Sequence, residues 1–215
     1  MTTLESAWIL LGQQLRKPAG VGGRLLARAM GLINGTSNRI AIAALHIAAN
    51  DTVLELGFGT GRAIKAMAGA TTEGQVFGID HSAVMSLQAS RLNLRAIQDG
   101  RVRLVQGSLD ALPWQDGAVD KCLAVHVAYF MGAKEIREAR RVLRSGGKLA
   151  VLVTDKGAMA HWKFAHPSTH RQFAASDLTK LLLDGGFSRE EMCVQRVSLG
   201  MGIPGLLALA IKSTA

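Results

Sequence analysis

Residues 53–61 read VLELGFGTG, and this stretch decides the fold. An apolar run stops at a glycine-punctuated turn, and the carboxylate of Glu55 lies two residues before the first glycine, Gly57. Glycine is needed where the backbone takes a positive φ angle or must approach a ligand closely. The stretch therefore predicts a buried strand, a tight ligand-binding turn and a helix that follows it.

Outward from this turn, strand-like and helix-like segments alternate along the chain. The predicted strands are 52–56, 75–79, 102–106, 119–125, 148–153, 192–199 and 206–211. The predicted helices between them are 62–68, 83–98, 134–143 and 175–183. Such alternation indicates a seven-stranded, mostly parallel α/β sheet with helices on both faces. No helix separates the last two strands, so a hairpin should make the final strand antiparallel.

The spacing of the glycines limits the class of ligand that the turn is expected to bind. In the dinucleotide fingerprint G-x-G-x-x-G the third glycine would stand where this chain has Arg62, whereas here Gly61 comes one residue early. The stretch resembles motif I of class I S-adenosylmethionine (SAM) dependent methyltransferases, which reads acidic-x-G-x-G-x-G. Segments 107–114, 116–120 and 140–149 resemble later parts of the same family in the same order. The resemblance covers about half the chain and implies a Rossmann-like fold.

The resemblance also implies a set of SAM-binding residues. They are Glu55, Gly57, Phe58, Gly59, Gly61, Asp80, His81, Ser108, Leu109 and His126. The turn and Glu55 would hold the methionine end, and His81 would lie beside the adenine. Ser108 and Leu109 would meet the adenine edge, where the family often has an aspartate instead of this serine. Asp110 or the backbone is therefore an alternative adenine partner.

Asp80 ends the second predicted strand, at the edge of the sheet where ligands bind in this fold class. A carboxylate can accept both hydroxyls of a ribose, because two vicinal donors match its two oxygens. The alternative is that Asp80 only caps the helix that follows. With the glycine turn upstream, ribose binding is the interpretation we favour.

The candidate catalytic residues, His126 and Tyr129, follow the fourth predicted strand. His126 is a candidate base for a phenol, amine or thiol, or else it hydrogen-bonds the backbone and shapes the pocket. Tyr129 would hydrogen-bond the substrate or pack against the cofactor. Downstream, segment 156–173 carries three histidines (His161, His166 and His170) and predicts either an acceptor-facing loop or a plain surface loop. We expect no metal site there, because a proline interrupts the segment and cysteines and carboxylates are missing.

Residues 1–50 form the predicted N-terminal part, ahead of a SAM-binding domain at 51–215. We expect helices at 4–15 and 25–33 and a third that is capped by Ser37 or Asn38 and runs to about residue 49. The chain carries 25 basic and 16 acidic residues, a net charge of +9, and the first forty residues are strongly basic. These helices would form a lid on their own domain or a basic amphipathic surface that contacts an anionic membrane. Alternatively, the basic residues only form a solvated face.

The function predicted from these features is methyl transfer from SAM to a small molecule or a lipid headgroup. Alternatives are a phospholipid N-methyltransferase at the membrane surface and a non-catalytic SAM-binding protein. The glycine spacing argues against a nicotinamide-dependent oxidoreductase. Nucleic acid is disfavoured as a substrate, because an Asn/Asp-Pro-Pro-aromatic tetrad is missing after the fourth predicted strand. Without a leader or a membrane-spanning run, we expect a cytoplasmic monomer or homodimer, peripheral at the inner membrane face if its acceptor is a lipid.

Overall fold

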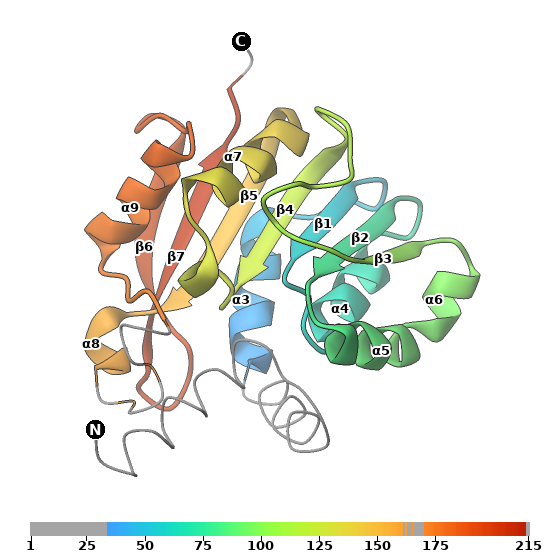
Figure 1. The fold of residues 1–215 in the computed structure, drawn as a ribbon, viewed down its shortest axis with the longest axis horizontal. Helices are drawn as coiled ribbons and strands as arrows, with labels where there is room; N and C mark the ends of the chain where they lie inside the picture. Colours follow the sequence, from blue (N-terminus) through green and yellow to red (C-terminus); the bar gives the residue numbers. More distant parts are fainter. Residues whose placement is uncertain (1–33, 161, 163–164, 166–169, 214–215) are drawn as a thin grey trace.

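The core of the molecule is a seven-stranded sheet with the order β3-β2-β1-β4-β5-β7-β6 (Figure 1). The structure, a computed structural model, describes residues 34–160, 162, 165 and 170–213. The strands are β1 (Thr52–Leu56), β2 (Gln75–Asp80), β3 (Val102–Gln106), β4 (Val119–Val125), β5 (Leu143–Thr154), β6 (Met192–Ser198) and β7 (Pro204–Ile211). The first five strands pair in parallel, whereas β7 runs antiparallel to both β5 and β6. The predicted sheet, including its antiparallel last strand, is confirmed.

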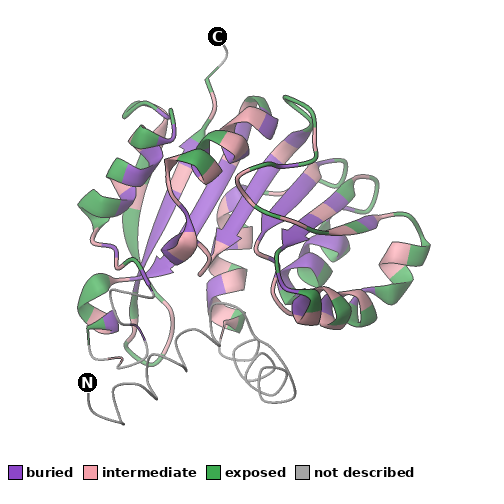
Figure 2. Cartoon of the chain, in the orientation of Figure 1, coloured by how far each residue is buried: buried purple, intermediate pink, exposed green. Residues whose placement is uncertain are grey.

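Helices cover both faces of the sheet (Figures 1 and 2). They are α3 (Gly35–Leu45), α4 (Arg62–Ala70), α5 (Ala83–Leu92), α6 (Leu94–Gln98), the 3-10 turn η1 (Ala128–Phe130), α7 (Ala133–Val142), α8 (Lys156–Met159) and α9 (Ala175–Asp184). Helices α3, α4 and α5 pack in one apolar cluster with the sheet, and α7 and α9 pack in another. The central strands are buried on both faces, as expected for a parallel sheet covered by helices.

Two of the predicted helices differ from the observed ones in their bounds. The helix predicted over 83–98 is two helices, because the chain turns at Asn93. The buried Asn93 amide donates to the carbonyls of Gly61 and Ala89, which ties this break to the glycine turn. The helix predicted from Ser37 or Asn38 begins earlier, at Gly35, and ends at Leu45, since the next residue has a left-handed backbone.

Helix α3 is the part of the predicted N-terminal segment that the structure describes. Ala41 and Leu45 are fully buried and pack in the same cluster as Leu123 of β4. The other two predicted N-terminal helices lie outside the described residues, so the boundary at residue 50 stays a prediction. Within the described part of the chain, none of the helices has the length and apolar character needed to cross a bilayer.

Candidate functional site

The glycine turn joins β1 to α4, and its glycines serve different purposes. Gly57, Gly59 and Gly61 all have positive φ angles, of 70°, 51° and 75°. A Cβ atom on Gly57 would lie 2.5 Å from Val127 Cγ2, and one on Gly61 would lie 2.7 Å from Ala89 Cβ. A Cβ on Gly59 would meet nothing within 4 Å. Two glycines therefore allow close packing, whereas Gly59 borders open space where a ligand can approach the backbone.

Asp80 holds this turn in place from the end of β2. Its Oδ2 accepts the Gly59 N–H at 2.9 Å, and its Oδ1 accepts the Ser82 N–H at 2.8 Å. The following helix is capped by Ser82, whose hydroxyl accepts the Met85 N–H, so the role of helix cap belongs to Ser82. Each carboxylate oxygen of Asp80 can still accept another bond, so the group remains able to receive two hydroxyls.

Glu55 is a buried carboxylate beside the turn, and its Oε2 has no hydrogen-bond partner among the described residues. Burial, and then the nearby charge of Asp80, raise the pKa of Glu55 well above its usual value. Buried charges are costly unless they are paired. The site therefore holds a buried carboxyl whose charged form has no cationic partner among the described residues.

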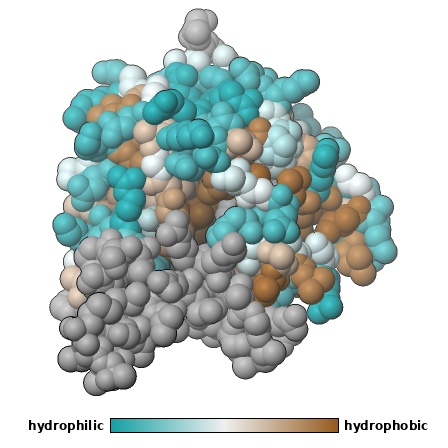
Figure 3. Space-filling model, in the orientation of Figure 1, coloured by the Kyte–Doolittle hydropathy of each residue, from teal (hydrophilic) through white to brown (hydrophobic). Residues whose placement is uncertain are grey.

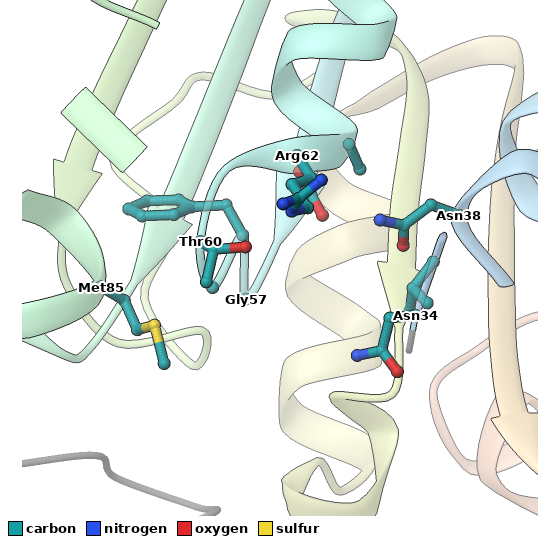
Figure 4. Close-up of a pocket in the computed structure, with 11 residues that line it drawn as sticks. Asn34, Asn38, Gly57, Thr60, Arg62 and Met85 are labelled. Atoms are coloured by element: carbon teal, nitrogen blue, oxygen red, sulfur yellow. The ribbon is translucent and has the colours of Figure 1, made fainter. Parts of the chain in front are cut away.

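An open pocket with a cavity volume of about 80 Å³ lies along this turn, which is smaller than the roughly 300–1,000 Å³ typical of small-molecule sites. Its lining residues are Asn34, Asn38, Glu55, Gly57, Phe58, Gly59, Thr60, Arg62, Ala63, Met85 and Val125. Figure 4 shows Asn34 and Asn38 extending from the α3 side toward the turn, with Arg62 beside them. The pocket thus combines the acid Glu55 with amide and guanidinium donors.

Several of these residues were absent from the prediction. Asn34 and Asn38 come from the start of a helix that precedes the turn in sequence, and the sequence indicates Asn38 only as a helix cap. The sequence marks Arg62 only as the residue that stands where the dinucleotide fingerprint has its third glycine. Polar residues at the start of a helix beside a ligand-binding turn were the available signal.

His126 immediately follows β4, and both of its ring nitrogens have partners within the protein. Nε2 lies 2.9 Å from Ser37 Oγ, and Nδ1 lies 3.1 Å from Tyr129 Oη. Burial lowers the pKa of His126 to about 4 and raises the pKa of Tyr129 to about 12, so both are neutral at neutral pH. His126 also has a positive φ of 56°, which is uncommon for a residue other than glycine.

The predicted adenine contacts lie outside the residues that line the pocket. His81 is exposed, and its Nδ1 is 3.7 Å from Asp80 Oδ1. Ser108 hydrogen-bonds Asp110, and this bond, together with Lys134, lowers the pKa of the Asp110 carboxyl. Leu109 packs against the apolar cluster under α7 and α9. Their roles stay predictions. Of the segment 156–173, His161 and His166 lie outside the described residues, whereas His170 is buried beside Phe130.

The donor set fits the methionine end of SAM, which carries an ammonium and a carboxylate. The unpartnered Glu55 oxygen suits the ammonium, and the amides of Asn34 and Asn38, with Arg62, suit the carboxylate. The open space above Gly59 leaves room for the ligand next to the backbone.

Comparison with known proteins agrees with this geometry. Residues 54–151 match the model of the "Methyltransferase domain" family. The chain is 32% identical over 129 residues to the uncharacterized methyltransferase YdaC of Bacillus subtilis, over 59% of this chain and 69% of that protein. It is 33% identical over 141 residues to the demethylmenaquinone methyltransferase of Tropheryma whipplei (strain Twist), over 64% of this chain and 50% of that protein. The chain thus spans one half to about two thirds of the length of these relatives.

Among solved structures, the chain is similar to one in the complex of the Haloferax volcanii Trm112 methyltransferase activator with a methyltransferase. The TM-score is 0.76 at 18% identity, over 89% of this chain and 95% of that one. At that identity the likeness concerns the fold.

Proposed function

This chain belongs to the class I SAM-dependent methyltransferases, and we propose that it transfers the SAM methyl group to a small-molecule acceptor beside the glycine turn. The observation that carries the proposal is the buried Oε2 atom of Glu55, which has no hydrogen-bond partner among the described residues and suits the ammonium group of SAM. When bound, SAM supplies an electrophilic methyl group on a sulfonium, so the protein mainly has to position and desolvate the acceptor.

We assign the chain's own residues as follows. Glu55 pairs with the ammonium of the cofactor, and the donors of Asn34, Asn38 and Arg62 receive its carboxylate. Asp80 accepts the ribose hydroxyls while it keeps the Gly59 N–H in place. His81, Ser108 and Leu109 remain the proposed adenine contacts.

Proton transfer by His126 or Tyr129 stays a prediction. A neutral imidazole has the protonation state that a base needs, but its low pKa makes it a weak one. Both ring nitrogens are already hydrogen-bonded, so one bond, to Ser37 or to Tyr129, must break before His126 accepts a proton from an acceptor.

Calorimetry with SAM and NAD tests the cofactor assignment. We expect SAM to bind and NAD to leave no measurable heat of binding, because the third glycine and Arg62 depart from the dinucleotide spacing. Tight NAD binding without SAM binding would remove the proposal. A screen of amines, phenols and quinones with methyl-labelled SAM then identifies the acceptor, and SAM binding without transfer to any of them favours a non-catalytic role.

A lipid headgroup as acceptor is a second proposal, supported by the outer surface of α5 and α6. Leu87, Leu92 and Leu94 are 45%, 38% and 54% exposed, and Arg91 and Arg95 are exposed beside them. Figure 3 shows apolar patches among hydrophilic ones over this region, at the right of the view. Basic and apolar side chains together favour an anionic membrane surface.

Vesicle sedimentation tests this second proposal. We expect salt-sensitive binding to phosphatidylglycerol vesicles but none to phosphatidylcholine vesicles, and weaker binding when Arg91 and Arg95 are both changed to Gln. The matched control changes Arg189 and Arg196, which are exposed elsewhere, to Gln. Loss of binding only on removal of residues 1–30 would place the contact in the N-terminal segment, and no binding at all would leave the small-molecule proposal alone.

A further inference from the structure

The helix α3 is joined to the carboxyl ends of the central strands by a buried polar contact. Ser37 is 3% exposed and lies on the face of α3 that also buries Ala41 and Leu45. Its hydroxyl is 2.9 Å from His126 Nε2. A hydroxyl on an otherwise apolar helix face is costly without a partner, so this contact specifies how α3 sits against the sheet.

The contact continues beyond His126 as a chain of hydrogen bonds. The Thr154 N–H, at the end of β5, donates to Tyr129 Oη at 2.7 Å. The tyrosine hydrogen is then free to donate to His126 Nδ1 at 3.1 Å, which leaves the imidazole hydrogen on Nε2 for Ser37. In this direction Thr154, Tyr129 and His126 each donate once, and Ser37 on α3 accepts the last bond.

The backbone conformation of His126 is consistent with a residue that several hydrogen bonds hold in place. Its φ of 56° lies in the left-handed region, which is unfavourable for a residue other than glycine. Strained residues persist where their surroundings determine them. Here the His126 N–H donates to Leu152 O at 2.8 Å, in addition to the two ring contacts.

The chain matters for the pocket because Ser37 lies between two residues that line it. Asn34 and Asn38 are four residues apart and therefore lie on one side of the first helical turn. Both face the glycine turn in Figure 4. A shift or rotation of α3 would move both amides away from the pocket.

We propose that His126 is a positioning residue that, through Ser37, holds α3 so that Asn34 and Asn38 form one wall of the cofactor pocket. The inference rests on the proposed function, since it assumes that the pocket takes SAM. It gives His126 a task that needs no proton transfer, and it makes the first turn of α3 part of the cofactor site.

The test compares Ser37→Ala with Thr36→Val, which also removes a hydroxyl from α3 but outside the chain of bonds. Calorimetry measures SAM binding, and hydrogen exchange followed by NMR measures the opening of α3. We expect Ser37→Ala to weaken SAM binding about 3- to 10-fold and to speed exchange of the α3 amides. Thr36→Val should leave both unchanged.

A second measurement reads the hydrogen-bond chain directly. The ¹⁵N resonances of His126 should show the tautomer protonated at Nε2, and Tyr129→Phe should shift them, because Nδ1 loses its donor. Tyr129→Phe should weaken SAM binding in the same direction as Ser37→Ala.

The outcomes separate the two proposals. A wild-type protein that binds no SAM overturns the proposed function. The positioning role is overturned if Ser37→Ala has the same SAM affinity and the same α3 exchange as the wild type. If the wild type binds no SAM, unchanged α3 exchange in Ser37→Ala overturns the role by itself. A hydrogen on Nδ1 instead of Nε2 overturns the assigned direction of the chain, and with it the role of Tyr129.

Discussion

At Glu55, the proposed binding of the cofactor opposes the stability of the protein. Its carboxyl is buried near Asp80, and one of its oxygens has no partner in the described part of the chain. A charged group in this position weakens the cofactor-free protein, but it is what an ammonium ligand requires. The proposed ligand, and not the fold, would thus explain this residue.

Replacing Glu55 with Gln should separate these two effects. The pKa of Glu55 is raised above 4.5 in the folded state, so its contribution to stability is full below about pH 4.5 and is lost as pH rises through the folded pKa. At pH 7 we therefore expect Glu55→Gln to be more stable than the wild type without SAM, with the difference shrinking toward pH 4.5. SAM binding should weaken about 10- to 100-fold, because a charged hydrogen bond is lost.

Urea unfolding at several pH values and calorimetry check this expectation. A variant that is less stable than the wild type at pH 7 and that binds SAM equally well would contradict both parts.

Two glycines of the turn should respond differently to the same substitution. Gly57→Ala meets Val127 at contact distances that no Cβ tolerates, in addition to a left-handed backbone, so we expect a loss of about 2–4 kcal/mol in the free energy of unfolding. Gly59→Ala meets only open space, so its cost should be the backbone strain of about 1–2 kcal/mol.

Gly59→Ala should nevertheless weaken SAM binding more than its small effect on folding implies, because its methyl group enters the pocket. Denaturation curves together with calorimetry distinguish the two variants. Equal losses of stability with unchanged SAM affinity in Gly59→Ala would show that the ligand does not approach this backbone.

At the scale of elements, the attachment of α3 should depend on pH. The pKa of His126 is about 4 in the folded state and about 6.5 when the ring is exposed, because burial opposes its charge. Between these values the unfolded chain binds the proton more strongly, so this contribution to stability is present above about pH 6.5 and is lost as pH falls toward 4.

We expect the wild type to lose more stability between pH 7 and pH 4.5 than His126→Asn does. Asparagine suits the comparison because it tolerates a left-handed backbone but does not titrate. Urea unfolding at the two pH values provides the measurement. Parallel losses in both proteins would mean that His126 does not contribute to the acid sensitivity.

At the scale of the whole molecule, the pocket involves residues from α3, β1, α4, α5 and β4, so cofactor binding should stabilise the entire domain. At a SAM concentration of 100 times Kd, linkage adds about 2.7 kcal/mol. For a chain of this length that corresponds to an increase of roughly 5–10 °C in Tm. Thermal unfolding with SAM and with NAD measures this increase in Tm. An equal increase with both ligands would contradict the selectivity for SAM.

Local patterns predicted most of the sheet and the centre of the site. Strand β1 was predicted with its observed bounds, because a continuous apolar run that ends in glycines is a short-range signal. The helix break at Asn93 was missed, since its cause is a bond to Gly61, thirty-two residues away. The apolar periodicity of residues 83–98 carries no information about Gly61.

The chain by itself determined the order of strands and helices, the glycine turn and the kind of cofactor, because these depend on spacing between neighbouring residues. Only the tertiary structure decided that Asp80 supports Gly59, that Glu55 Oε2 has no hydrogen-bond partner among the described residues, and that His126 meets Ser37 eighty-nine residues away. The physical reason is that hydrogen bonds and desolvation depend on distances in space. A sheet whose strands are ordered β3-β2-β1-β4-β5 brings such distant residues together at one edge.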